Sequence, residues 1–457
     1  MLLNTSKTNQ QNLFYSPLSD MLDMNDPLIA LANVIDWKIF ENEFAIFYSK
    51  DGSPAKPIRL MVGLLILKQL ENLSDESIVI QWKRNPYYQY FCGYNEMQPC
   101  EPCHSTQLVK FRQRIGKKGM ELIFKVSVQL HGACAEEKQV LIDTTVQEKN
   151  ITYPTDGKLA IKMIHHLHKI AKENSIALRR TFVKEIKEHR INLRFFRHPK
   201  KIKKAKASIK RLRTIVGILI RDISRILPLE QLVNYQEKFN LFDKVRNQQM
   251  KDSNKVLSLH ETHVYAVTKG KDHKKYEYGT KASIVATKDS GVIVGVASHS
   301  KNEHDSKTLE AALISANTTR TTPIKEAICD RGYRGVKEVL GTTICIPGTP
   351  LKRDSEYQKQ KKREKFKRRA AIEPIIGHLK SDFRLARNYL KGFIGDQINL
   401  LLAATAWNLK KWMNIYFFAL FNGKIKLLLE SVSQIKLYYQ IFLQLIVIKL
   451  IFSHAGD

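Results

Sequence analysis

The stretch RAAIEPIIGHLKSDFRLARNYLKG, residues 369–392, has a glutamate, Glu373, near the start of a repeating apolar pattern. Basic residues, among them Lys380, Arg384 and Arg387, lie within the same pattern. Its isoleucine, leucine and phenylalanine residues recur mostly three and four positions apart, which predicts an amphipathic helix over 373–390. Pro374 fits best in the first turn of such a helix and so places Glu373 at its start. Because a helix N-terminus favours a negative charge, one interpretation of Glu373 is a capping charge with no further role.

Two features of the wider sequence favour an active site instead. From 352 to 391 the chain has fourteen Lys and Arg residues against five acids, so Glu373 stands in a positive field. Two further acids, Asp143 and Asp330, each follow a short apolar run that predicts a buried strand. An acid at such a place is often only a turn former. Carboxylates among phosphate-binding charges, however, are what a metal-dependent enzyme acting on phosphodiesters requires.

At this point the sequence resembles the DDE transposases of bacterial insertion sequences. The group it resembles carries a Tyr-x2-Arg-x3-Glu-x6-Lys signature, which Arg369, Glu373 and Lys380 match at the right spacings. The tyrosine position holds Phe366, which keeps the ring and loses the hydroxyl. The run from Arg384 through Arg387 to the glycine at 392 also looks like the family, and the resemblance covers about residues 33–412.

The resemblance implies roles for these residues. Asp143, Asp330 and Glu373 would be the catalytic acids and would hold two divalent ions, with Mg²⁺ the expected metal and Mn²⁺ the alternative. The DNA-binding residues would include Arg369, Lys380, Arg384 and Arg387, which would hold phosphates of the DNA end. The other interpretation of Arg369 and Lys380 is that they pair with nearby acids.

The overall charge points to a polyanionic partner. The chain has 457 residues with 75 Lys and Arg against 44 Asp and Glu, a net charge of +31. Such an excess indicates either nucleic acid or an anionic membrane surface. Six cysteines do not make a disulfide scaffold, and the N-terminus lacks an apolar core of signal-peptide length, so we expect a cytoplasmic protein that meets DNA there.

Residues 157–258 form an insertion of different composition. They hold 26 Lys and Arg and 8 acids, which is more than half of the excess charge of the chain. The run Lys200, Lys201, Lys203 and Lys204 is its densest part, and apolar residues at helical spacing predict long helices. A charge run is often only a solvated face. A helical arm this basic is better explained by contact with DNA phosphates.

The pattern of elements predicts an α/β protein with a ribonuclease-H-like catalytic core; the fold name rests on the resemblance. Residues 1–135 read as an N-terminal helical domain. The resemblance implies that this domain recognises element ends or mediates dimerisation, and the alternative is a helical cap without DNA contact. Residues 136–156 and 259–415 would form the catalytic domain. We expect a hairpin around 288–291, a helix capped by Asp305 or Ser306, and helices over 355–369 and 397–412.

Two remaining stretches have structural explanations. Cys100, Cys103 and His104 have the spacing of a haem attachment sequence, but neither export nor a second ligand pair for zinc is evident, so a turn before a helix is expected. The apolar tail is residues 416–457, of which 437–452 is too short and too polar to span a bilayer. We expect a packing or oligomerisation helix there and no membrane partner.

These expectations combine into one functional hypothesis with two alternatives. The chain would be a transposase that cleaves double-stranded DNA at element ends and joins it to target DNA, as a homo-oligomer, with a dimer the simplest form. A metal-dependent nuclease on the same core is the first alternative. A DNA-binding protein without catalysis, in which the three acids are structural, is the second.

Overall fold

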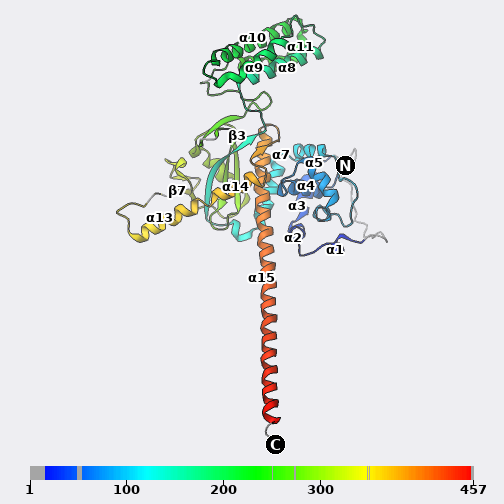
Figure 1. Ribbon diagram of the computed structural model, residues 1–457, viewed down its shortest axis with the longest axis vertical. Helices are drawn as coiled ribbons and strands as arrows, with labels where there is room; N and C mark the ends of the chain where they lie inside the picture. The colour runs from blue at the N-terminus through cyan, green and yellow to red at the C-terminus, as the bar shows by residue number, and fades with distance from the viewer. Residues whose placement is uncertain are drawn as a thin grey trace.

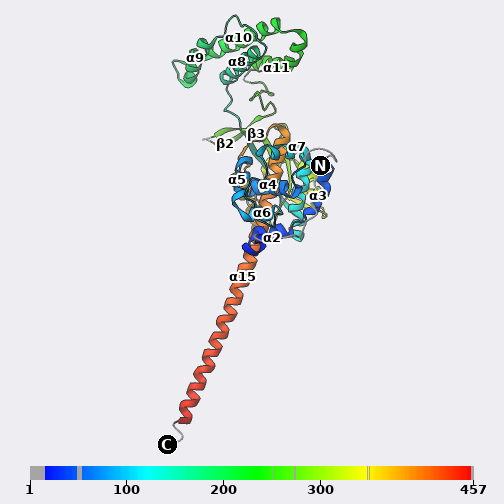
Figure 2. The same ribbon diagram turned by 90° about the vertical axis from the view of Figure 1, so that its right-hand side faces the viewer.

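The computed structural model describes residues 16–48, 54–249, 251–271, 274–346, 348 and 350–453, with the backbone alone at 269–271, 274, 366 and 424–453. Figure 1 shows the sheet on one side of the helix α15 (Gly392–Ser453) and the N-terminal helices on the other. The helices of the insertion stand at one end, and α15 runs out of the body at the opposite end as a single rod (Figure 1, Figure 2).

The N-terminal part is helical, as the sequence predicts. Its longest helix, α7, bends at Gly116, whose φ of 57° is left-handed. The turn before α7 holds the free thiols of Cys100 and Cys103, and the ring of His104 caps the helix. The helices are α1 (Leu18–Met21), α2 (Pro27–Val34), α3 (Trp37–Ala45), α4 (Ile58–Leu70), α5 (Asp75–Arg84), α6 (Pro86–Phe91), α7 (Ser105–Gln129) and η1 (Gly132–Ala135).

Eight strands of the described residues form one mixed sheet. The path is β2-β3-β1-β5-β7-β6, with β4 beside β3 and β8 beside β1. The strands are β1 (Gln139–Lys149), β2 (Tyr265–Lys271), β3 (Lys274–Thr287), β4 (Ile293–His299), β5 (Glu326–Ile328), β6 (Glu338–Val339), β7 (Thr342–Cys345) and β8 (Arg387–Asn388).

Strand direction decides where the carboxyl ends of the strands meet. β1 is antiparallel to β3, and β3 is antiparallel to β4, so β4 and β1 run the same way. β5 is parallel to β1, and β7 is parallel to β5. The carboxyl ends of β4, β1, β5 and β7 therefore lie along one edge of the sheet, where loops after parallel strands commonly carry functional side chains.

Helices on either side fix the sheet in place. α12 (Leu309–Thr319) packs on β3 and β4, and Gly295 allows this close approach because a Cβ there would lie 2.7 Å from the backbone nitrogen of Ala316. α15 covers the edge strand β4, where the Asn408 side chain bonds both the N–H and the C=O of Ile293. The backbone groups of Ile293 are thereby unavailable to a strand of another chain. The sheet and the N-terminal helices share one continuous core.

The insertion has a core of its own. Its helices are α8 (Asp156–Glu173), α9 (Val183–Asn192), α10 (Ile202–Ile226) and α11 (Leu229–Asn247), with the short η2 (Leu193–Arg197) between α9 and α10. Leucine, isoleucine, valine and phenylalanine side chains from these helices pack against one another in a cluster separate from the main core. The predicted long helices are confirmed, and the body they form stands apart from the sheet in both views (Figure 1, Figure 2).

A buried ionic cluster lies at the base of the insertion, where it joins the sheet. Lys149, the last residue of β1, pairs with Asp396 of α15 and, at 3.4 Å, with Glu261, and all three side chains are at most 4% exposed. Asn388 and His263 also bond the Asp396 carboxylate. The chain therefore leaves the sheet and returns to it at one fixed place.

The predicted helix over 373–390 is wrong in its second half. α14 (Ile372–Ser381) ends early, Arg384 has a φ of 60°, and β8 follows. The amide of Gln69 bonds the carbonyl of Phe383, and Asn399 bonds that of Arg384, so tertiary contacts replace the helical hydrogen bonds.

Two other helix boundaries also differ from the prediction. The helix predicted from 397 is the inner part of α15, which begins at Gly392. The residues 305–307 form a separate short turn, η3 (Asp305–Lys307), and α12 begins after it with Thr308 at its N-cap. α13 (Glu356–Arg369) begins after Ser355, as expected.

A buried ionic group joins three of the N-terminal helices. The Asp75 carboxylate accepts from Lys68 at 2.9 Å and from Arg112 at 2.8 Å. Burial alone would raise the pKa of Asp75, but the hydrogen bonds and charges of Arg112 and Lys68 outweigh it and lower that pKa to about 2. Burial also lowers the pKa of Lys68 to about 8 in spite of Asp75.

We predict that Asp75→Asn lowers the free energy of unfolding by about 3–5 kcal/mol, because two buried cations lose their counter-charge. Urea denaturation at neutral pH measures the change. The control is Glu121→Gln, which breaks the exposed pair with Lys117 and should cost under about 1 kcal/mol. Equal, small losses in both variants would show that Asp75 does not carry a stabilising buried charge.

Because the folded pKa of Asp75 lies below its ordinary value, its contribution to wild-type stability should disappear as the pH falls from ~4 toward 2.

Candidate active site

The parallel pairing of β1 and β5 brings two of the predicted acids together. Leu141 and Ile328 are register partners on the two strands. Asp143 and Asp330 each lie two residues further along, so they stand at the same level on neighbouring strands. Asp330 follows the end of β5 and caps η4 (Arg331–Tyr333), where it accepts from the Gly332 N–H at 2.7 Å.

The chemistry of neighbouring groups supports this placement. The pKa of the buried Cys329 thiol is raised by burial and then by the negative charges of Asp330 and Asp143. Both carboxylates therefore lie close to the same sulfur. Asp143 lies within β1 and Asp330 comes two residues after β5, so both are held close to the sheet, which suits a site that must hold its geometry.

A third acid, Asp305, joins this pair although the sequence indicated only a helix cap. Thr144, next to Asp143 on β1, donates its hydroxyl to Asp305 Oδ1 at 3.0 Å. Lys281 of β3 donates to the same oxygen at 2.9 Å. The signal that could have revealed Asp305 is its place after β4, because β4 ends at the same edge as β1 and β5. That signal needs the strand directions, which the sequence does not provide.

Glu373 lies beside the two strands but points outward. Its neighbour Ile372 packs against Leu141 and Ile328, so α14 is fixed over the strands that carry the aspartates. The Glu373 side chain is 61% exposed and accepts from Arg369 Nη2 at 3.1 Å. The glutamate is in the first turn of α14, as predicted.

Among the described residues, no three His, Cys, Asp or Glu side chains come close enough together to hold a metal ion. The donors present are nevertheless of the right kind, since carboxylate oxygens are the ligands that Mg²⁺ prefers. Because Gly332 has no side chain, space remains beside the carboxylates of Asp305 and Asp330. A Cβ on this residue would lie 2.9 Å from both Asp305 Oδ2 and Asp330 Oδ1. The residues therefore fit a divalent cation in chemistry, and the missing side chain of Gly332 leaves room beside two of the carboxylates.

The predicted phosphate-binding bases differ in their surroundings. Lys380 lies 3.9 Å from the buried carboxylate of Glu277, and Arg369 bonds Glu373, so both have acid partners as the alternative interpretation expected. Arg384 donates to the carbonyl of Asn72 in the N-terminal part, whereas Arg387 is exposed. The side chain of Phe366 lies outside the described residues.

The predicted lysine run lies on the surface of the insertion. Lys200, Lys201, Lys203 and Lys204 are all exposed at the start of α10. The opposite face of this helix is buried, with Ala205, Ser208 and Leu212 at or below 3% exposure. Lys203 and Lys204 therefore lie on the solvent face of an amphipathic helix, and Lys201 just before it lies over the ring of Phe195 at 4.4 Å.

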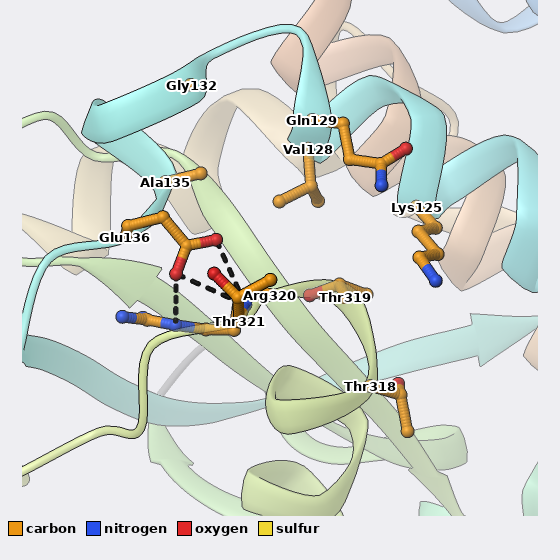
Figure 3. A pocket seen from close by; sticks show the side chains of 10 residues that line it. All are labelled: Lys125, Val128, Gln129, Gly132, Ala135, Glu136, Thr318, Thr319, Arg320 and Thr321. Carbon is orange, nitrogen blue, oxygen red and sulfur yellow. Dashed lines mark hydrogen bonds and ion pairs between the residues drawn. The ribbon is translucent and has the colours of Figure 1, made fainter.

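A pocket of about 240 Å³ lies elsewhere, between α7 and the end of α12 (Figure 3). Its residues include Glu136 and Arg320, which precede β1 and follow α12. Glu136 accepts from the backbone of Thr321 and Thr322, and the buried Arg320 donates to the carbonyl of Glu137. These contacts tie α12 to the start of β1. They explain the pocket as a structural junction, and none of the acids at the carboxyl edge lines it.

Comparison with known proteins assigns the chain to a family. Residues 16–114 match a family described as a transposase domain, and residues 254–409 match one described as a transposase DDE domain. The chain belongs to the DDE transposases of insertion sequences. The helical insertion and Asp143 lie outside both matched stretches. Enzymes with this domain typically use a divalent metal.

A relative from Rhizobium meliloti, the uncharacterized protein ORF8 in the nfe locus, is also similar to this transposase. The two are 37% identical over 196 residues, which is 42% of this chain and 95% of the relative. No solved structure matches the chain. Within the described residues, no helix combines the length and the apolar character needed to cross a membrane.

Proposed function

We propose that this transposase binds the ends of its insertion sequence as double-stranded DNA, cleaves them in a metal-dependent reaction and joins the freed 3′ ends to target DNA. The observation that supports this most directly is the parallel pairing of β1 with β5, which sets Asp143 of β1 level with Asp330, two residues past the end of β5. The order of strand, hairpin, helix, strand and helix in β1, β3–β4, α12, β5 and α14 supports a ribonuclease-H-like core.

Asp143, Asp330 and Glu373 are the proposed catalytic acids and metal ligands. Two Mg²⁺ ions, or Mn²⁺ in their place, would activate the attacking water or 3′ hydroxyl and stabilise the leaving oxygen. Asp143 and Asp330 already stand at the same level on neighbouring chain segments. Glu373 is held nearby by Ile372, and its exposed side chain is free of packing that would stop it from exchanging Arg369 for a different partner.

Positive side chains around these acids would hold the DNA. Arg369 and Lys380 would bind phosphates at the cleaved end, Arg369 through its planar fork and Lys380 as a point charge. Arg384 and Arg387 would continue this surface toward β8. Each of these residues neutralises phosphate charge without reading the base sequence.

The other parts of the chain have proposed roles as well. The N-terminal helices would bind the element ends, and the insertion would hold DNA phosphates through Lys200, Lys201, Lys203 and Lys204. The long α15 would join two copies into a dimer; the side chains of 437–452 lie outside the described residues. The site of action would be the cytoplasm, where the protein would meet chromosomal or plasmid DNA.

We predict that Glu373→Gln lowers nicking of an end-containing duplex in Mg²⁺ by at least about a hundredfold, because the variant loses a ligand charge. DNA affinity should stay the same or rise, since a carboxylate that repels phosphate is removed. Asp143→Asn and Asp330→Asn should behave alike, and combining two changes should add little.

The control for this prediction is Glu364→Gln, an exposed acid within the same basic segment. It should nick at the wild-type rate. Near-normal nicking by the Glu373→Gln protein would instead make Glu373 a helix-terminal charge. Nicking without joined products would favour the nuclease alternative, and binding without nicking would favour a DNA-binding protein.

We also predict that replacing Lys200, Lys201, Lys203 and Lys204 by Ala flattens the salt dependence of DNA binding. Each phosphate contact contributes roughly −0.9 to the slope of log affinity against log salt, so losing several contacts should be measurable. A titration over a range of salt concentrations, with nicking at low salt as a second readout, tests this.

The comparison variant removes four other bases of the insertion: Lys169, Lys172, Arg221 and Arg225, which are exposed on α8 and on the far end of α10. Its slope should change less. The same flattening in both variants would show that only net charge matters, and an unchanged slope in the first would show that its lysines are merely solvated.

A further inference from the structure

The two oxygens of Asp305 have different surroundings. Oδ1 accepts from the Thr144 hydroxyl and from the Lys281 ammonium group, so the carboxylate is anchored to β1 and β3. Lys281 is itself nearly buried and also donates to the carbonyl of Glu303. Among the hydrogen bonds of the described residues, none reaches Oδ2. An anchored carboxylate with one oxygen left over is arranged to bind something beyond its own fold.

The remaining oxygen lies on the same side of Gly332 as Asp330 Oδ1, which itself accepts from the Gly332 N–H. Asp305 Oδ2 and Asp330 Oδ1 approach the α-carbon of Gly332 from the same side, each 2.9 Å from the position of a Cβ. The φ of this glycine is not in the left-handed region, so its backbone conformation does not explain the lack of a side chain. The explanation that remains is space: any side chain would push the two carboxylates apart. Two carboxylates that face one small space repel each other unless a cation lies there.

A buried hydroxyl borders the same acids. The Tyr333 side chain is fully buried, and its hydroxyl makes no hydrogen bond within the described residues. Burial raises the pKa of Tyr333, the negative charges of Asp143 and Asp305 raise it further, and the nearby Thr308 side chain lowers it. The surroundings of this hydroxyl are therefore set in part by the same acids that border the proposed ion.

We propose that Asp305 is a further carboxylate of the cation site, with Oδ1 anchored by Lys281 and Thr144 and Oδ2 facing an ion shared with Asp330. The strands support the assignment, because Asp305 follows β4, Asp143 lies on β1 and Asp330 follows β5, and these strands run in the same direction. The inference rests on the proposed metal-dependent function and adds an acid outside the signature of the family.

The test is a calorimetric titration of the full-length protein with Mn²⁺ in the absence of DNA. Asp305→Asn keeps the shape of the side chain and an acceptor for Lys281, and it should weaken Mn²⁺ binding by about tenfold or more. The matched control is Glu310→Gln, an exposed acid at the start of α12 that loses the same charge and should bind as the wild type does. Unchanged affinity in Asp305→Asn would overturn the proposal.

Gly332→Ala provides a second measurement that leaves every charge in place. Its methyl group would meet only the ends of two side chains at under 3.0 Å, so the fold should persist while the carboxylates separate. Mn²⁺ affinity should again fall by about tenfold or more, with thermal unfolding of the metal-free protein little changed. If Asp305→Asn does not fold, the Mn²⁺ affinity of Gly332→Ala decides between the outcomes. An affinity equal to that of the wild type would refute an ion shared by Asp305 and Asp330.

Asp143→Asn separates this inference from the function on which it rests. If Asp143→Asn abolishes Mn²⁺ binding and Asp305→Asn does not affect it, the proposed site stands and the role of Asp305 is wrong. If the wild-type protein binds no Mn²⁺, both proposals fail. Parallel losses in Asp143→Asn, Asp305→Asn and Gly332→Ala, with normal binding by Glu310→Gln, support both.

Discussion

The pairing of β1 with its neighbours is the constraint on which the rest of the structure depends. β1 bonds β3 along one edge, and β5 and then β8 along the other. The parallel register with β5 sets Asp143 beside Asp330. A shift of that register by one residue would turn the acids to opposite faces and would exchange Val140 and Ile142, which pack in the main core, with Leu141, which packs in a separate cluster. The packing of the core therefore protects the geometry of the site.

The sequence was informative where the signal is local. An apolar run that ends on an acid predicts the strands β1 and β5 correctly, because both features lie within a few residues; Asp330 follows β5 as expected, whereas β1 continues past Asp143. Asp305 could not be found in this way, since its role depends on the direction of β4 relative to β1. The helix predicted over 373–390 failed for a related reason: Gln69 and Asn399, far away in the chain, bond the carbonyls that the helix would have used.

The site combines fixed and adjustable parts. Asp143 and Asp330 are set by strands, and Asp305 is tied to two of them through Thr144 and Lys281. Glu373 is different, because a fixed helix carries an exposed side chain whose partner is an arginine. The position of the Glu373 backbone is thus fixed by the packing of α14. Its carboxylate is held only by a surface ion pair, which contributes little free energy. Changing that partner requires no movement of the fold.

The buried ionic cluster at the base of the insertion has a consequence for how such a chain can diversify. The ion pair of Lys149 and Glu261 joins the segment that leaves the sheet to the segment that returns to it. The geometry of the sheet therefore depends little on the size of the insertion between them. Closing a longer loop adds only about 0.6 kcal/mol for each doubling of its length. The helical body also keeps its own core. Bodies of other sizes and charges could therefore be exchanged at this point over evolutionary time, leaving the catalytic sheet unaltered.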